Sequence, residues 1–270
     1  MSRSDLDTLC AIATDAGQAI LQIYASDFQV DYKGPGDPVT DADRAANVII
    51  CERLRAHFPD AAIVAEESPE EAYLDYRSSS RVFFVDPLDG TREFVARNGQ
   101  FVVMIGLLVE NAVTLGVVYA PATGTLWFGS PELGAYRRDS DGSERSIHVG
   151  AVLEPAQAKV TISRSRRSEP LAQALRRIAP RAVAPMGSAG LKGSLVAEAT
   201  VDAYLAIGAA GKHWDGCAME ALVTAAGGCV TDARGQPLNY RAEGMELEHG
   251  LLASNHSLHR ALLARLSATI

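Results

Sequence analysis

The segment DPLDGTREF, residues 86–94, follows directly on the apolar run RVFFV of residues 81–85. The run predicts a buried strand that stops at the Asp-Pro pair, because proline fixes φ and offers no N–H to a strand ladder. Asp86 and Asp89 then lie on one rigid turn with the Leu88 carbonyl between them, a set of oxygen donors that suits a hard cation. An ordinary turn closed by Asp89-Gly90 is the alternative interpretation of the same residues.

Carboxylates at three other places accompany this turn. Glu66-Glu67 follow a short apolar run, and adjacent like charges repel unless they are solvated or bound to a cation. Asp215 opens a predicted helix, where an aspartate also serves as an N-cap. Asp43 follows Thr40 at the spacing of a capping box. Each position taken singly fits a structural role, and only their combination favours a metal site.

The pattern of apolar residues divides the chain near residue 150. In the first part we expect helices over residues 6–23 and 42–58, a loop over residues 31–43, and strands at residues 62–65, 81–85, 101–109, 112–119, 125–128 and 134–137. In the second part we expect strands at residues 159–163, 202–206 and 229–231, helices at residues 169–178, 191–199 and 214–226, and a last helix capped by Ser257. The sequence thus predicts an α+β N-terminal lobe, residues 1–150, and an α/β C-terminal lobe, residues 151–270.

The composition limits the class of protein. Of 270 residues, 47% are hydrophobic and 21% charged, which excludes a disordered chain, a collagen and a disulfide miniprotein. The net charge of −8 gives no overall basic footprint, so we expect no nucleic-acid partner. Four cysteines without a C-x-x-C pair, an N-terminus unlike a signal peptide and the lack of a long apolar run predict a cytoplasmic protein without a transmembrane segment.

Four segments, VTDADRAAN, AEES, DPLDGTREF and WDGCA, occur in this order at the spacings of the inositol monophosphatase superfamily. The chain resembles this superfamily over nearly its whole length. The resemblance implies a layered α/β/α/β/α fold with the active site between two lobes, and a lithium-sensitive phosphomonoesterase that uses two or three Mg²⁺ ions, with Mn²⁺ as a substitute. It allows a homodimer and peripheral association with the inner membrane.

The resemblance also implies roles for individual residues. The metal ligands would be Glu66, Asp86, the Leu88 carbonyl, Asp89 and Asp215. Glu66, Asp43 and Thr91 would form the catalytic group, in which Asp43 and its hydroxyl partner Thr91 orient the attacking water. Gly90 and Thr91 would donate to the substrate phosphate, and Glu67 would support Glu66. The chain departs from the family pattern in having Ala65 before the acidic pair and Met219 one turn beyond Asp215, where the family has glycine.

Within the superfamily, the string DPLDGTREFVARNGQF resembles the bacterial CysQ-type 3'(2'),5'-bisphosphate nucleotidases of sulfur metabolism. Lys192 stands where the inositol enzymes carry an acid, and a cation there suits a second phosphate. The substrate-binding set would be Glu66, Leu88, Asp89, Gly90, Thr91, Arg92, Ser188, Lys192 and Asp215, with further cationic candidates at Arg164, Arg166 and Arg167. An exposed helix lysine is the alternative for Lys192.

The expected reaction is hydrolysis of adenosine 3',5'-bisphosphate to AMP and phosphate, with 3'-phosphoadenylyl sulfate as a second substrate. A phosphatase for inositol 1-phosphate or another sugar phosphate is the first alternative. A non-catalytic factor of an RNA or transcription complex is the second, and the intact acidic set argues against it.

Overall fold

The computed structural model describes residues 2–34 and 36–267. Its helices in this part of the chain are α1 (Arg3–Tyr24), α2 (Asp41–His57), α3 (Thr91–Val95), α4 (Glu169–Ile178), α5 (Ala189–Ala197), α6 (His213–Ala225) and α7 (His256–Leu266). Short 3-10 turns occur at Glu70–Ala72, Tyr76–Ser78 and Pro155–Gln157. None of the helices within the described ranges is long and apolar enough to cross a membrane.

Two large sheets carry the fold. The strands of the seven-stranded sheet, in spatial order, are β3 (Ala62–Ala65), β4 (Arg81–Asp89), β5 (Val102–Val109), β6 (Ala112–Ala120), β7 (Thr125–Ser130), β8 (Gly134–Arg138) and β9 (Glu144–Ile147). Those of the five-stranded sheet are β11 (Ala182–Met186), β10 (Lys159–Ser163), β12 (Ala203–Ala206), β14 (Leu251–Asn255) and β13 (Gly228–Thr231). A hairpin of β1 (Val30–Gly34) and β2 (Asp37–Thr40) stands apart from both.

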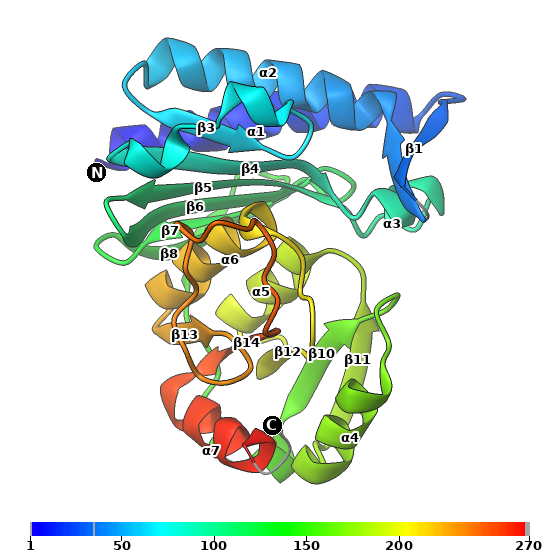
Figure 1. The fold of residues 1–270 in the computed structure, drawn as a ribbon, viewed down its shortest axis with the longest axis vertical. Helices are drawn as coiled ribbons and strands as arrows, with labels where there is room; N and C mark the ends of the chain where they lie inside the picture. Colours follow the sequence, from blue (N-terminus) through cyan, green and yellow to red (C-terminus); the bar gives the residue numbers. More distant parts are fainter. Residues whose placement is uncertain (1, 35, 268–270) are drawn as a thin grey trace.

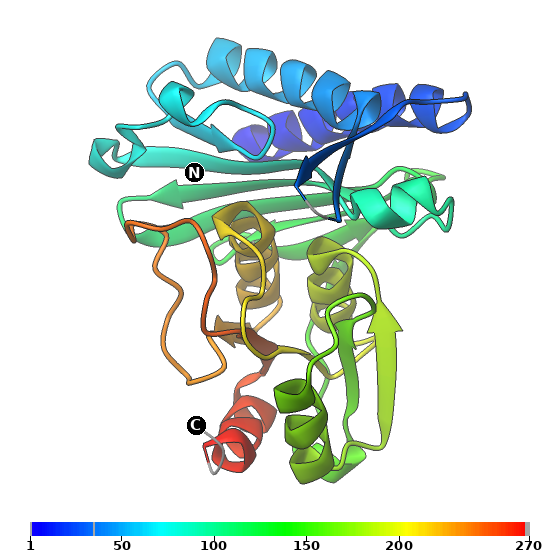
Figure 2. The same cartoon turned by 45° about the vertical axis from the view of Figure 1, so that its right-hand side comes forward.

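The helices and sheets stack in layers (Figures 1 and 2). Helices α1 and α2 pack together against one face of the seven-stranded sheet, and α6 packs on its other face. Helices α5 and α6 also contact strands of the five-stranded sheet, whose outer face is covered by α4 and α7. The α/β/α/β/α layering that the resemblance implies is therefore confirmed.

Close packing of α6 against the large sheet depends on two glycines. A Cβ at Gly106 on β5 would lie 2.5 Å from the backbone nitrogen of Ala218, and one at Gly116 on β6 would lie 2.2 Å from its carbonyl oxygen. Real Cβ contacts are not that short, so only glycine lets the helix backbone approach these strands. This approach fixes the height of the N-terminus of α6, which carries Asp215, above β4 and β5.

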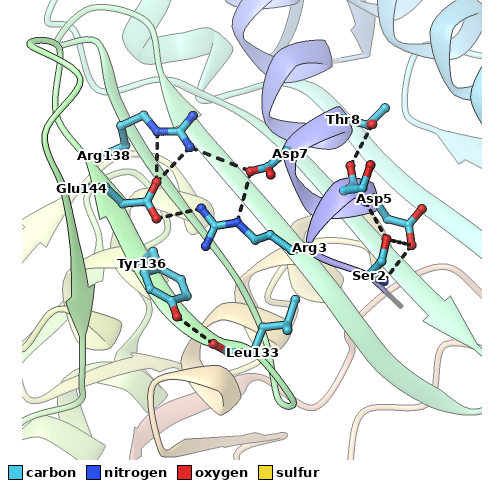
Figure 3. Close-up of polar contacts among 10 residues, drawn as sticks. Ser2, Arg3, Asp5, Asp7, Thr8, Leu133, Tyr136, Arg138 and Glu144 are labelled. Carbon is cyan, nitrogen blue, oxygen red and sulfur yellow. Dashed lines mark hydrogen bonds and ion pairs between the residues drawn. The ribbon is translucent and has the colours of Figure 1, made fainter.

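The first residues of α1 form a capping box and ion pairs. Ser2 caps α1 in a reciprocal capping box with Asp5, and the helix buries an apolar stripe that includes Leu6, Leu9 and Ile20. Arg3 lies 2.7 Å from Glu144 of β9 and 3.2 Å from Asp7. Figure 3 shows both ion pairs. These ion pairs are largely exposed, so they contribute little to stability.

The structure corrects several sequence predictions. Strand β4 does not stop at the Asp-Pro pair but continues to Asp89, and the register against β5 shifts between Asp86 and Asp89, where Pro87 cannot take part in the ladder. The predicted loop over residues 31–43 contains the β1–β2 hairpin and the first turn of α2. Strands β9, β11 and β14 were not predicted. The last helix is capped by Asn255 instead of Ser257.

All strands of the seven-stranded sheet precede those of the five-stranded sheet in the sequence. The last strand of the seven-stranded sheet ends at Ile147, and the first strand of the five-stranded sheet begins at Lys159. The proposed boundary between lobes 1–150 and 151–270 falls in the segment between these two strands. Helices α5 and α6 belong to the second lobe by sequence yet pack on the sheet of the first.

Candidate active site

A cavity of about 310 Å³ opens where β4, α3 and the starts of α5 and α6 meet. The predicted site residues that line it are Glu66, Asp86, Leu88, Asp89, Gly90, Thr91, Arg92, Ser188, Lys192 and Asp215. Asp43 is not part of the lining, but it reaches the cavity wall through a hydrogen bond from Thr91. The structure thus brings together residues that are 149 positions apart, from Glu66 to Asp215.

Three of the predicted metal ligands form a compact cluster. Asp86, Asp89 and Asp215 each place a carboxylate oxygen within 4.8 Å of the other two. Burial raises the pKa of Asp86 well above its ordinary value, and the charges of Glu66 and Asp89 add to the rise. Burial and the charge of Asp89 raise the pKa of Asp215 to about 7. Carboxylates held this close repel one another, and a divalent cation among them offsets that repulsion.

Local structure explains this cluster. Strands β3 and β4 run parallel and their pairing ends with Ala65 opposite Val85, so Glu66 and Asp86, the next residue of each, lie at the same end of the pair. Asp86 accepts a hydrogen bond from the Leu88 N–H at 3.0 Å, which fixes the turn. Gly90 has φ of +103°, a left-handed conformation that glycine adopts without strain, and it leads the chain into α3. Asp215 accepts a hydrogen bond from the Lys212 N–H at 2.6 Å at the start of α6.

Asp89 also holds the start of α5. Its Oδ2 accepts hydrogen bonds from the Ser188 hydroxyl at 2.6 Å and from the Gly190 N–H at 2.7 Å. Ser188 in turn accepts from the Leu191 N–H at 3.0 Å as the N-cap of the helix. Asp89 therefore joins the turn at the end of β4 to the helix that carries Lys192.

Glu66 and Glu67 share a cation from the hairpin. The Lys33 ammonium lies 2.8 Å from Oε1 of Glu66 and 2.7 Å from Oε1 of Glu67. Burial raises the pKa of Glu66, and the Lys33 charge opposes that rise. Within the described residues Glu66 is not part of the 4.8 Å cluster, although it lines the same cavity.

Buried Asp43 and half-buried Thr91 form a pair at the edge of the cavity. Oδ2 of Asp43 accepts from the Thr40 N–H at 2.7 Å and from its hydroxyl at 2.6 Å, which is the predicted capping box. Oδ1 of Asp43 lies 3.0 Å from the Thr91 hydroxyl, which also lies 3.2 Å from the Leu88 carbonyl oxygen. A hydroxyl has one proton, so Thr91 donates to one of these acceptors and keeps lone pairs that can accept a hydrogen bond.

Lys192 is buried, not the exposed helix lysine of the alternative interpretation. Its side chain lines the cavity with the residue only 3% exposed, and its ammonium donates to the Ser188 carbonyl at 2.5 Å. The ammonium also lies 4.9 Å from the ring centre of Tyr204. Burial lowers the pKa of Lys192 to about 8 against the opposing charges of Asp89 and Asp215.

The predicted arginines separate in the structure. Arg166 lines the cavity, whereas Arg164 donates to the Gln100 side chain at 2.7 Å. Arg167 is not among the lining residues. Arg92 lines the cavity and also donates from Nε to the Gly36 carbonyl at 3.0 Å, which ties α3 to the hairpin.

The departure at Met219 is accommodated by α5, the helix that packs against α6. Met219 is fully buried, and a Cβ at Gly193 on α5 would lie 1.8 Å from its Cγ. The absence of a side chain at Gly193 makes room for the methionine, so the two helices stay close beneath Asp215.

Sequence reasoning missed three residues of this site. Lys33 lies in a segment predicted as a loop, and its partners are more than 30 positions away. Tyr204 and Glu93 line the cavity from β12 and α3. Glu93 lies within the quoted motif, and its position two residues after Thr91 was the available signal.

The fold and this acidic cavity define a phosphatase class, and the chain belongs to the inositol monophosphatase family, whose profile matches residues 2–270. Enzymes of this family depend on metal ions. The chain is 36% identical to the 3'(2'),5'-bisphosphate nucleotidase CysQ of Escherichia coli K12 over 251 residues, 92% of this chain and 99% of that protein. It is 36% identical to the CysQ protein of Salmonella typhimurium over 237 residues, 87% of this chain and 93% of that protein.

Solved structures show the same fold. The extragenic suppressor protein suhB of Bartonella henselae matches with a TM-score of 0.86 and 27% identity, over 99% of this chain and 100% of that one. The inositol monophosphatase of Anabaena matches with a TM-score of 0.80 and 29% identity, over 98% of this chain and 96% of that one.

Proposed function

We propose that this protein is a 3'(2'),5'-bisphosphate nucleotidase that uses Mg²⁺ to hydrolyse adenosine 3',5'-bisphosphate to AMP and phosphate. Its similarity to the CysQ nucleotidases supports the substrate class. The single observation that carries the proposal is the buried Lys192 ammonium beside an acidic cluster in one cavity. An acidic cluster serves the reacting phosphate through a cation, and a separate ammonium serves a phosphate that stays on the product.

The residues fit a hard divalent cation. Asp86, Asp89 and Asp215 would hold it, with Glu66 and the Leu88 carbonyl completing an all-oxygen set that favours Mg²⁺ or Mn²⁺ over zinc. Mg²⁺ bound there would neutralise phosphate charge and lower the pKa of a water. Ser188 and Gly190 keep Asp89 in place, and Lys33 keeps Glu66 and Glu67 near the cavity.

Asp43 and Thr91 would position the attacking water. With the Thr91 proton directed to Asp43 or to the Leu88 carbonyl, a lone pair of the hydroxyl faces outward to accept a hydrogen bond from water. The backbone N–H groups of Gly90 and Thr91, at the start of α3, would donate to the reacting phosphate. No side-chain nucleophile is needed for this reaction.

Lys192 would hold the phosphate that is not hydrolysed, with Arg166 and Arg92 as further cations of the cavity wall. The sulfate-bearing 3'-phosphoadenylyl sulfate also places an anionic group at the 5' end, so it is proposed as a second substrate. We further propose a role in sulfur metabolism, inhibition by lithium and a cytoplasmic location, the last supported by four free cysteines.

A phosphate-release panel tests the proposal. The chelator-treated enzyme, resupplied with Mg²⁺, is compared on adenosine 3',5'-bisphosphate, adenosine 3'-phosphate, inositol 1-phosphate and fructose 1,6-bisphosphate. We expect the highest kcat/KM for adenosine 3',5'-bisphosphate. A higher value for inositol 1-phosphate would contradict the proposal and favour the sugar-phosphatase alternative. A folded protein inactive on all four would favour the non-catalytic one.

A further inference from the structure

One buried carboxylate of the cavity has no part in the mechanism above. Glu93 lies on α3, two residues beyond Thr91, and lines the cavity with the residue 7% exposed. Among the residues that the structure describes, no side chain or backbone N–H donates a hydrogen bond to its carboxylate, and it forms no salt bridge. Its oxygens are not enclosed by the described part of the chain, so the carboxylate is open to the cavity and can accept a hydrogen bond from a bound molecule.

The fold keeps the Glu93 side chain in this position. Gly187 stands directly against it: a Cβ there would lie 2.3 Å from Cγ of Glu93 and 2.6 Å from Oε1. The Gly187 N–H is itself used, donating to the Gln100 side chain at 3.0 Å. The glycine backbone therefore forms one wall for the carboxylate and leaves the cavity as the open side.

The charges around Glu93 define what can bind it. Burial lowers the pKa of Lys192, and the negative charge of Glu93 is among those that oppose this, so the two side chains lie within electrostatic range. A carboxylate accepts hydrogen bonds and repels phosphate. Of the groups that a bisphosphorylated nucleoside offers, Glu93 therefore favours a hydrogen-bond donor, a sugar hydroxyl or the amino group of the base, over either phosphate.

We propose that Glu93 is a specificity-determining residue that accepts a hydrogen bond from the ribose hydroxyl next to the phosphoester that is cleaved. This inference rests on the proposed function. In a nucleoside 3'-phosphate that hydroxyl is the 2'-OH, the donor nearest to the reacting phosphate, and Glu93 follows directly after the turn proposed to hold that phosphate. The amino group of the base is the other donor of the substrate, and it lies further from the reacting end.

The test compares three substrates: adenosine 3',5'-bisphosphate, its 2'-deoxy analogue, and inosine 3',5'-bisphosphate, which lacks the amino group. For the wild-type enzyme we expect kcat/KM to be about ten- to one-hundredfold higher for the ribose substrate than for the deoxy analogue, since a charge-assisted hydrogen bond is lost. In Glu93→Gln this ratio should fall several-fold. Gly187→Ala should lower the ratio in the same way, because its Cβ displaces the carboxylate. The matched control is Glu52→Gln, at an exposed position of α2.

Each result decides something. A wild-type ratio near one, or a ratio that Glu93→Gln leaves as high as in the control, overturns the inference while the proposed function stands. The inference is also overturned if the wild-type kcat/KM is lower for inosine 3',5'-bisphosphate than for the adenosine substrate and this difference disappears in Glu93→Gln. The donor to Glu93 would then be the amino group of the base. Failure of the folded wild-type enzyme to release phosphate from any of the three substrates refutes the proposed function itself, and the inference with it.

Discussion

Replacing Asp89 by asparagine and by alanine separates its two roles, at the metal site and at the start of α5. Oδ2 accepts hydrogen bonds from Ser188 and Gly190 in a buried setting. Asparagine loses the charge but keeps one oxygen that can accept from Ser188 and Gly190. Alanine loses the charge and the acceptor oxygen. Because both variants remove the same charge, the relief of repulsion from Asp86 and Asp215 cancels when they are compared with each other.

The difference between the two variants follows from those two hydrogen bonds. A buried donor left without its acceptor costs about 1–3 kcal/mol, so Asp89→Ala should be about 2–4 kcal/mol less stable than Asp89→Asn. For a chain of 270 residues that corresponds to a melting temperature lower by about 4–7 °C. Turnover should fall by about two to four orders of magnitude in both variants, because both weaken the site for the cation.

The assay is thermal unfolding in excess EDTA, followed by phosphate release per folded molecule with Mg²⁺. EDTA removes the stabilisation that bound metal would add. Equal melting temperatures for the two variants would refute the role of Asp89 at α5. Wild-type turnover in Asp89→Asn would refute its role as a metal ligand.

Three further predictions concern neighbouring groups. Asp43→Asn should be as stable as the wild type, since the amide oxygen can still accept hydrogen bonds from Thr40. The variant should have a kcat lower by about two orders of magnitude with an unchanged Mg²⁺ requirement. An unchanged kcat would contradict the proposed role of Asp43 in positioning water. Lys192→Met should lower the ratio of kcat/KM for adenosine 3',5'-bisphosphate over adenosine 3'-phosphate by about one to two orders of magnitude. In the wild type this ratio should decline as the pH rises through about 8, because the Lys192 ammonium loses its proton there. Equal losses of kcat/KM on both substrates in the variant would make Lys192 structural. Burial raises the pKa of Glu220 to about 7, so the folded protein binds this proton more tightly than the unfolded chain and loses stability as the pH rises from about 4.5 through 7. Glu220→Gln keeps an acceptor for Tyr240 and should therefore raise the free energy of unfolding by roughly 2–3 kcal/mol at pH 8 and change it little at pH 4. Equal effects at both pH values in chemical denaturation would contradict this prediction.

Local signals in the sequence predicted much of the fold. The apolar periodicity of α1 and α2, the Thr40 capping box and the alternation of strands and helices after residue 150 all depend on neighbours in sequence. The predictions failed where non-local pairing decides. Strand β14 exists because it pairs with both β12 and β13, and β4 extends past Pro87 because Asp89 pairs with Val102.

The candidate site was predictable where the motif itself holds the residues. Asp86, Leu88, Asp89, Gly90 and Thr91 are neighbours on one turn, so their meeting is local. The salt bridges from Lys33 to Glu66 and Glu67, and the hydrogen bonds that Asp89 accepts from α5, join elements distant in sequence. The burial of Lys192 depends on how α5 packs between the sheets, which no local pattern encodes.

The role of Asp86, Asp89 and Asp215 as the seat of a catalytic cation is tested most directly by a Mg²⁺ titration. Phosphate release from adenosine 3',5'-bisphosphate is measured with chelator-treated wild-type enzyme and with Asp215→Asn, which keeps an oxygen for the Lys212 N–H. We predict no release without metal, a saturable return of activity in the wild type, and a return in Asp215→Asn that is at least about a hundredfold smaller. Full activity without metal, or an equal return in the variant, would contradict this account.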